Sequence, residues 1–521
     1  MSITRTVAKA AAFLMAANLI SRILGFLRES LVAGLFGKNN LTDAFNTAFI
    51  LPDLLYWLLV GGVLSSAFIP VVSEYIAKGK SDEGWRIISS VVNIIFLALS
   101  SLTVVGLILT PQFVRLQVPG FDAQTTALTI HLTRIILIQP LILALSGLTM
   151  GILNAHKIFW PSALGSVLYN ASIIIFGTLF TLMGLGISGF AFGVVLGAAA
   201  NFAVQLPALR RIGMKYHPII EFHHPGVHRI ALLAVPIVLS YTLNQLQVIV
   251  NSHLGSSLPA GSLTAVWQSY RLYQLPVGIF ALAIAVAVFP TLTEQAALHQ
   301  WEDFKATSSS ALRTIIFITL PISVGMIVLR FPLIRVLFQH GHFTAADTAA
   351  TAIPLLYFAV GIVAQSMIQI LPRMFYALQD TWTPVILGLV AMGVNILAMI
   401  LLVKPLAHGG LAFATSISAL VNMILLIYVL RRRLGTMDGR RLLVTLVKSL
   451  AASLVMGAAV WGWSAWLARM LGHGTGASIL VLFTGTGLGA LVFGVLARVL
   501  RMEEFKQVWG LVERRFFSVS T

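Results

Sequence analysis

The chain has 521 residues, of which 58% are hydrophobic and 10% are charged, and its mean hydropathy is +0.93. Soluble globular domains carry about 25% charged residues, so this composition excludes an ordinary soluble protein. The formal net charge is +17, but the basic residues lie in short loops between apolar runs. No long polar segment is left to form a nucleic-acid-binding domain, so we expect no nucleic-acid partner. With no cysteine, a disulfide framework and thiolate–metal chemistry are excluded.

Apolar runs of roughly 20 residues recur along the chain and predict an all-α polytopic membrane protein. The first run continues past Arg22, Arg28 and Glu29 instead of ending at a small-residue cleavage site, so it predicts a retained helix rather than a signal peptide. We predict about fourteen spans, at residues 8–37, 41–76, 86–110, 124–150, 158–183, 187–209, 229–252, 262–296, 306–329, 345–376, 382–403, 408–430, 442–468 and 476–500.

The loops between these spans predict the orientation of the chain. An even number of spans puts both termini on one side of the membrane. If that side is cytoplasmic, the inside segments hold twenty-two Lys and Arg residues and the outside segments hold six. Because cytoplasmic loops are enriched in Lys and Arg, we predict that both termini are cytoplasmic.

A weak internal duplication predicts the domain organisation. Leu51-Pro52 recurs as Leu275-Pro276, Pro70 to Glu74 resembles Pro290 to Glu294, and Pro161 to Gly165 resembles Pro384 to Gly388. The offsets are 220 to 224 residues. We predict two pseudo-symmetric six-helix lobes, followed by two further helices and a cytoplasmic tail. These parts are residues 1–228, 229–435 and 436–521. Repeats of this kind are typical of transporters whose site lies between the halves.

Several arginines lie inside predicted spans, where each charge costs about 2.5–3.5 kcal/mol: Arg22, Arg28, Arg134, Arg271 and Arg373. Three of them are candidates for a site. Arg22 and Arg28 lie deep in the first span, Glu29 shares a helical face with Arg22, and Arg271 lies in the second half of the duplication. Their charge serves either an anionic ligand or a buried acid partner. With only Glu29 and Asp43 nearby, we favour a phosphate or diphosphate, which arginine binds in bidentate fashion. Charges closer to the predicted helix ends are explained by snorkelling or local capping: Asp53, Glu74, Arg134 and Glu294.

The histidine-rich stretches do not predict a metal site. Residues 215–228 read KYHPIIEFHHPGVH and contain two prolines but no cysteine or close carboxylate pair, which indicates a solvated loop. In QHGHFT, Gly341 predicts a tight turn. No G-x-x-x-x-G-K-[ST] loop is present, so we expect neither ATP nor another cofactor.

Several motifs, in order along nearly the whole chain, resemble the MurJ (MviN) family. They are SRILGFLRE (21–29), TDAF (42–45), the AFIP–SEY segment (67–75), GILN (151–154), FQHGHFT (338–344) and FYALQDTWTP (375–384). The resemblance implies a bacterial lipid II flippase of the multidrug/oligosaccharidyl-lipid/polysaccharide exporter superfamily, which is a transporter rather than an enzyme. It would move the undecaprenyl-diphosphate-linked peptidoglycan precursor to the outer leaflet of the inner membrane by alternating access. The resemblance also implies a monomer among membrane lipids, coupling to a monovalent cation or the membrane potential, and other cell-wall synthesis proteins as candidate partners.

The resemblance also implies residue roles. Arg22, Arg28 and Arg271 match arginines of the family's cationic cavity, and Asp43 matches a functionally important acid. We expect the three arginines to bind the diphosphate. We expect cavity or gating roles for four further residues: Glu29, Asp43, Tyr56 and Gln274.

At three places the sequence departs from the family pattern. Tyr56-Trp57 replaces an arginine pair, and Gln274 replaces an acid. Asn251, Asn395 and Met399 stand where some members bind sodium through carboxylates, so we expect no metal site.

Alternative functions are a flippase for another polyprenyl-diphosphate-linked glycan, a drug exporter of the same superfamily, and a non-transporting scaffold of the cell-wall machinery. A membrane glycosyltransferase is excluded because the sequence has no large extracytoplasmic loop with clustered acids.

Overall fold

A computed structural model describes residues 3–59, 81–435, 438–472 and 474–506, together with positions 68, 71, 74, 75 and 78. Within these residues the regular elements are all helices, which confirms the all-α prediction. By their internal contacts the residues divide into two compact units, Met1–Gly261 and Ser262–Thr521. The two units are described separately.

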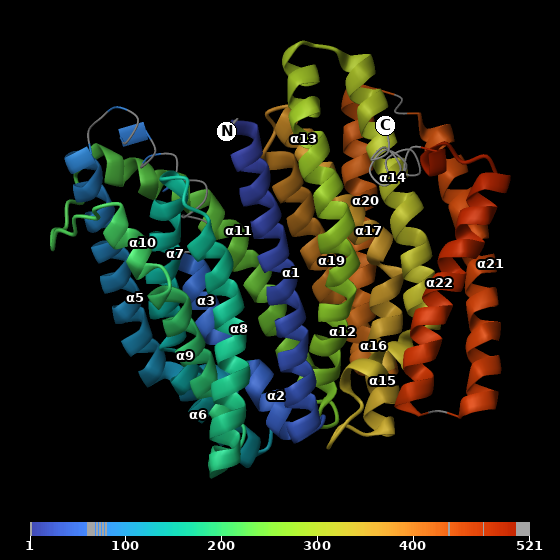
Figure 1. The fold of residues 1–521 in the computed structure, drawn as a ribbon, viewed down its shortest axis with the longest axis horizontal. Helices are drawn as coiled ribbons and strands as arrows, with labels where there is room; N and C mark the ends of the chain where they lie inside the picture. The colour runs from blue at the N-terminus through green and yellow to red at the C-terminus, as the bar shows by residue number, and fades with distance from the viewer. Residues whose placement is uncertain are drawn as a thin grey trace. The chain divides into compact units, whose positions relative to one another are not determined.

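The first unit is a bundle of long helices (Figure 1). In chain order its helices are α1 (Ile3–Phe36), α2 (Asn40–Thr47), α3 (Ile50–Leu59), α5 (Ser81–Gln117), α6 (Ala123–Ile136), α7 (Gln139–Ala155), α8 (Trp160–Phe180), α9 (Ser188–Ala203), α10 (Leu206–Arg211) and α11 (Pro225–Gly255). Helix α11 packs on α3 and α5. The predicted lobe boundary at residue 228 follows the helix count, whereas the contacts change at Gly261. The three-part division therefore remains a prediction.

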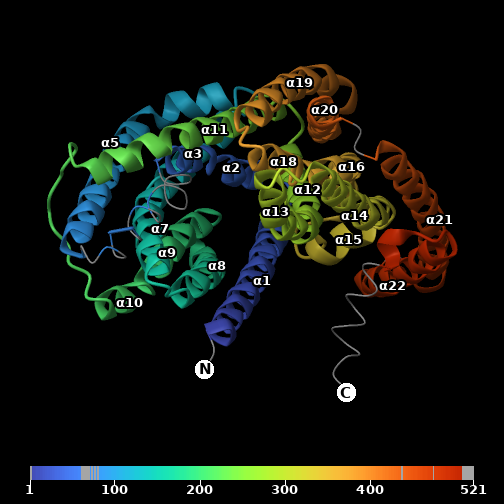
Figure 2. The ribbon, with the colours of Figure 1, turned by 90° about the horizontal axis from the view of Figure 1, so that it is seen from above.

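The second unit begins with α12 (Ser262–Pro276) and ends beyond α22 (Figure 1). Its other helices are α13 (Leu282–Ala297), α14 (Trp301–Val328), α15 (Arg330–Phe338), α16 (Ala345–Val360), α17 (Ile362–Ile368), α18 (Leu371–Ala377), α19 (Trp382–Leu406), α20 (His408–Leu434), α21 (Gly439–Leu471) and α22 (Thr475–Val499). Figure 2 shows α21 and α22 at the periphery of this unit. Helix α21 packs on α14 as well as on α22.

Ten helical segments of the described residues are long and apolar enough to cross a membrane, or eleven if the bent pair Ala345–Val360 and Ile362–Ala377 forms one span. Each coincides with a predicted span, which confirms a multi-pass membrane protein. The total of fourteen remains a prediction. Of the other three predicted spans, two correspond to α1 and α11, with 34 and 31 residues. The third, residues 41–76, lies partly outside the described residues, and so do Val60, Gly61 and Gly62.

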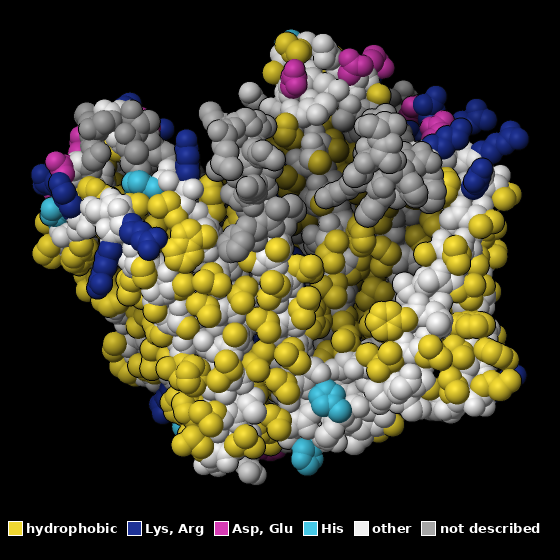
Figure 3. All heavy atoms as spheres, viewed as in Figure 1, with side chains coloured by type: hydrophobic (Ala, Val, Ile, Leu, Met, Phe, Trp, Pro, Cys, Tyr) yellow, Lys and Arg dark blue, Asp and Glu magenta, His cyan; other side chains and the backbone are white. Residues whose placement is uncertain are grey.

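The surface and the helix contacts both suit a lipid environment. Hydrophobic side chains cover much of the face in Figure 3, and residues such as Leu182 and Phe483 are about three-quarters exposed. Small residues let neighbouring helices approach closely. A Cβ on Gly197 of α9 would lie 2.7 Å from the Tyr169 carbonyl oxygen of α8. This close contact fixes the part of α8 that faces α1.

Candidate functional site

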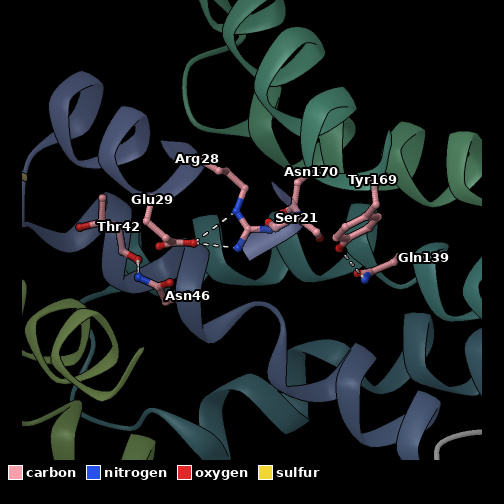
Figure 4. Close-up of polar contacts among 8 residues, drawn as sticks. All are labelled: Ser21, Arg28, Glu29, Thr42, Asn46, Gln139, Tyr169 and Asn170. Atoms are coloured by element: carbon pink, nitrogen blue, oxygen red, sulfur yellow. Dashed lines mark hydrogen bonds and ion pairs between the residues drawn. The ribbon is translucent and has the colours of Figure 1, made fainter. Parts of the chain in front are cut away.

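Arg28 lies where α1 packs on α8. Its Nη2 and Nε donate to Glu29 Oε1 at 2.8 and 3.3 Å, and its Nη1 donates to Asn170 Oδ1 of α8 at 3.4 Å (Figure 4). The Arg28 and Glu29 side chains are 18% and 11% exposed, so the pair is largely enclosed. Sequence analysis placed Glu29 on the face of Arg22, but the ion pair that forms is with its neighbour Arg28. Arg22 itself is exposed on α1.

A polar cluster holds Asn170 in place. Its Nδ2 donates to Ser21 Oγ at 3.1 Å and to the Ser166 carbonyl at 3.2 Å, and Ser21 Oγ donates to the same carbonyl at 3.0 Å. With its amide nitrogen occupied, Asn170 turns its oxygen toward Arg28 (Figure 4). Sequence analysis missed Ser21 and Asn170 as site residues, although a polar side chain in the middle of an apolar run is a signal that could have identified them.

The geometry leaves the Arg28 guanidinium able to change partners. Its contact with Asn170 is long for an N–H···O hydrogen bond, whose usual range is 2.7–3.2 Å. Its Nε and Nη2 both donate to the same oxygen of Glu29, Oε1. An incoming oxyanion could therefore replace the Asn170 contact and use the fork of donors that arginine offers to phosphate.

Tyr169 and Asp53 lie in the same region of the first unit. Gln139 Nε2 donates to the Tyr169 hydroxyl at 3.1 Å (Figure 4). Tyr169 directly precedes Asn170, the Arg28 partner on α8. Asp53, predicted as a local cap, lies in the first turn of α3. An aromatic hydroxyl therefore lies on the same helix as Asn170.

Asp43 anchors a backbone turn. It lies in the first turn of α2, a helix capped by Asn39 and Thr42 in a reciprocal capping box. Asp43 is 3% exposed, and its Oδ2 accepts a hydrogen bond from the Gly261 N–H at 2.7 Å. Gly261 has φ +81°, and a Cβ there would lie 2.7 Å from Lys38 Cγ. Asp43 therefore holds the turn at which the first unit ends.

Tyr56, for which we predict a cavity or gating role, is partly buried in α3 against the apolar core of the first unit. Its ring meets that of Trp57 edge-on, with centroids 5.5 Å apart. The two residues therefore form an aromatic pair within α3, and a role in a cavity or gate stays a prediction.

Arg271 and Gln274 belong to α12 of the second unit. Arg271 is half-buried, and Gln274 Nε2 donates to the Tyr270 hydroxyl of the same helix at 2.7 Å. Tyr270 and Tyr273 pack on Phe358 of α16. The structure thus places Arg22 and Arg28 in one unit and Arg271 in the other. A site formed by all three remains a prediction.

Two of the longer motifs have structural roles. Asp380 Oδ1 accepts from the N–H groups of Trp382 and Thr383, and its Oδ2 pairs with Arg433 at 2.5 Å, which ties the start of α19 to the end of α20. In FQHGHFT, Gly341 has φ +57°, as the predicted turn requires, and Thr344 caps α16. Among the described residues, no group of three or more His, Cys, Asp or Glu residues could hold a metal ion.

The chain matches one family model over most of its length. The family described as "Lipid II flippase MurJ" matches residues 32–482. A probable lipid II flippase MurJ of Buchnera aphidicola is 31% identical over 442 residues, 84% of this chain and 86% of the relative. A protein of the same description from Vibrio cholerae is 29% identical over 97% of this chain and 98% of its own length.

Solved structures agree with this match. A lipid II flippase MurJ in an inward closed conformation superposes with a TM-score of 0.78 at 26% identity, covering 94% of this chain and 99% of the other. An inward-facing multidrug resistance transporter of the MATE family gives a TM-score of 0.68 at 16% identity, covering 82% of this chain and 99% of the other. At that identity the second likeness concerns the fold alone.

Proposed function

The chain belongs to the MurJ lipid II flippase family, and from this membership we propose that it moves lipid II from the inner to the outer leaflet of the bacterial inner membrane. Lipid II is the undecaprenyl-diphosphate-linked peptidoglycan precursor. The task is transport, with no bond broken. The protein acts in cell-wall synthesis as a multi-pass protein with both termini in the cytoplasm.

We assign the diphosphate to Arg22, Arg28 and Arg271. The observation that carries this assignment is Arg28, an arginine enclosed in a membrane helix beside a single neighbouring carboxylate and a long contact to Asn170. Intramembrane ionisable residues are costly and usually mark a substrate path. Arg22 adds an exposed cation about one and a half turns earlier on α1.

Transport proceeds by alternating access of the two lobes. Glu29 holds Arg28 when no substrate is bound, while Asp43, Tyr56 and Gln274 shape the cavity and its gate. Pro52 and Pro276 allow helix bending. The membrane potential or a monovalent cation gradient supplies the energy, and the chain works as a monomer.

The test is growth of a bacterial strain depleted of its own lipid II flippase. The informative variant is Arg28→Gln/Glu29→Gln, because it removes both charges, keeps hydrogen-bonding side chains, and leaves no unpaired charge in the membrane. We expect this variant to reach wild-type levels in the membrane and to fail to support growth. The matched control is Arg115→Gln, an exposed arginine in the last turn of α5.

Two results would count against the proposal. If wild type inserts correctly but does not prevent lysis, the substrate is another polyprenyl-linked glycan or a drug, or the chain is a scaffold. If the double variant supports growth as well as Arg115→Gln does, the diphosphate role of Arg28 is wrong.

A further inference from the structure

A cationic cavity lies within the second unit, and none of the residues assigned to transport lines it. Its volume is about 310 Å³, and its cations come from three places: Arg313 of α14, Arg440, Arg441 and Lys448 of α21, and Arg501 just after α22. Ligand pockets usually have volumes of about 300–1,000 Å³. This one therefore suits a small polar group rather than a whole lipid.

The cavity lies at the edge of the membrane-spanning region. Arg440 and Arg441 are in the first turn of α21, and Arg501 follows the last residue of α22 by two positions. Both helices are candidate spans. Lys448 Nζ, in the third turn of α21, donates to the Leu500 carbonyl at 2.8 Å, which links α21 to the end of α22. In Figure 3, Lys and Arg side chains gather at the upper right, where Figure 1 shows one end of α21. The ends of membrane-spanning helices are where lipid headgroups are expected.

The base of the cavity is fixed by ion pairs of the buried Arg313 with the exposed Glu503 and the buried Glu504. Arg313 Nη1 donates to Glu503 Oε2 at 2.9 Å and to Glu504 Oε1 at 3.1 Å, and Thr445 Oγ1 donates to the same Glu504 oxygen at 2.9 Å. Arg313 is 9% exposed, and its Nε has no hydrogen-bond partner. Arg313 also holds the pKa of Glu503 below its usual range, so that carboxyl is ionised at neutral pH.

The rim of the cavity has an excess of positive charge. Arg441 lies 3.7 Å from Asp438, but among the described residues the Arg440 and Arg501 side chains make no hydrogen bond or ion pair. The five lining cations face only two lining carboxylates, Glu503 and Glu504. An anion would therefore be attracted to this rim.

Arg501 is held in an unfavourable backbone conformation. Its φ is +51°, in the left-handed region that favours glycine. The turn closes α22 through bonds from the Arg501 N–H to the Arg498 carbonyl and from the Met502 N–H to the Ala497 carbonyl. Glycine would satisfy this turn with less strain. Strained residues of this kind cluster at ligand-binding sites, where the side chain has a function.

We propose that this cavity binds the phosphodiester headgroup of an anionic membrane lipid. Basic pockets between membrane helices on the cytoplasmic side are suited to such headgroups. Arg440 and Arg501 hold the phosphate from two helix ends, Arg313 and Lys448 line the cavity below, and the acyl chains remain in the surrounding bilayer. The site is independent of lipid II transport and joins the ends of α21 and α22 to α14.

The test is lipid binding by the full chain purified in detergent, measured with dioctanoyl phosphatidylglycerol by isothermal titration calorimetry. Dioctanoyl phosphatidylcholine and inorganic phosphate are the comparison ligands. We expect saturable binding of phosphatidylglycerol that weakens about tenfold or more in Arg440→Gln/Arg501→Gln, because two charge-assisted contacts are lost. The control is Arg431→Gln/Arg432→Gln, which removes two exposed arginines from the last turn of α20, and we expect it to bind as wild type does.

Arg501→Gly separates a binding role from a purely structural one. We expect it to raise the melting temperature without lipid, because the strained turn is relieved, and to lose the further rise that phosphatidylglycerol gives to wild type. The proposal is overturned if Arg501→Gly keeps that lipid response, if both double variants lose affinity equally, or if inorganic phosphate binds as tightly as phosphatidylglycerol.

Discussion

At the scale of single residues, the Arg28–Glu29 pair resolves a conflict between stability and function. An isolated charge in a membrane helix costs about 2.5–3.5 kcal/mol, and removing one partner of a buried pair costs about 3–5 kcal/mol. Glu29 therefore makes Arg28 tolerable before substrate arrives. The long Asn170 contact at 3.4 Å is a weak hydrogen bond, which the proposed diphosphate would replace at little cost. Arg28 is thus stabilised by Glu29, while its guanidinium makes only a weak hydrogen bond to Asn170.

Asn170→Asp tests this idea by adding a carboxylate next to Arg28. A charge-assisted bond contributes about 1.5–3 kcal/mol, so the new carboxylate competes with the diphosphate, and we expect lipid II affinity to fall about tenfold or more. The measurement is lipid II binding to the purified variant. Ser21→Ala is the matched control, because it removes a bond of the same cluster and adds no charge. Equal affinities for Asn170→Asp and Ser21→Ala would contradict the proposed role of Arg28.

At the scale of elements, the turn after α11 is fixed from several directions. Besides the Asp43–Gly261 bond, the Gly120 N–H donates to Ser256 Oγ at 3.1 Å, so the loop before Gly261 stays on the first unit. The next residue, Ser262, begins α12, the helix that carries Arg271. Asp43 therefore helps to hold the turn that precedes α12. Asp43 thus has a structural role that requires no contact with substrate.

Gly261→Ala should destabilise the chain more than Gly213→Ala. Both glycines have positive φ, +81° and +69°, so both substitutions carry a backbone cost of about 1–2 kcal/mol. Only Gly261 also has Lys38 within 2.7 Å of the new Cβ, whereas Gly213 has nothing within 4 Å. We expect about 1–3 kcal/mol of additional loss from this overlap. The measurement is thermal unfolding in detergent, and equal melting temperatures would show that the Gly261 turn is not tightly held.

The helices were easier to predict than the site. Runs such as residues 382–403 and 476–500 were recognised from hydrophobicity alone, because a membrane span requires a continuous apolar stretch. Side-chain pairing needs tertiary contacts, so the sequence did not identify Asn170 as a partner of Arg28, which is 142 residues away. Helical periodicity predicts that Glu29 shares a face with Arg22. The long side chain of Arg28 nevertheless reaches the carboxylate of the next residue, Glu29. The roles of the Asp380 and Thr344 motifs likewise became visible only from their contacts.

At the scale of the whole molecule, the two units each supply part of the proposed site. Arg22 and Arg28 belong to the unit Met1–Gly261, and Arg271 belongs to Ser262–Thr521. The cationic cavity at α14, α21 and α22 lies within the second unit alone. It can therefore be altered without changing any of the three arginines.

The most direct measurement is the amount of lipid II exposed on the outer face of the inner membrane in cells depleted of their own flippase. A membrane-impermeant, amine-reactive reagent labels the stem peptide of exposed lipid II. The account predicts that wild type restores this labelling and that Arg28→Gln/Glu29→Gln does not, at equal protein levels in the membrane. Unlabelled lipid II in cells that carry correctly inserted wild-type protein would contradict the assignment of this chain as a lipid II flippase.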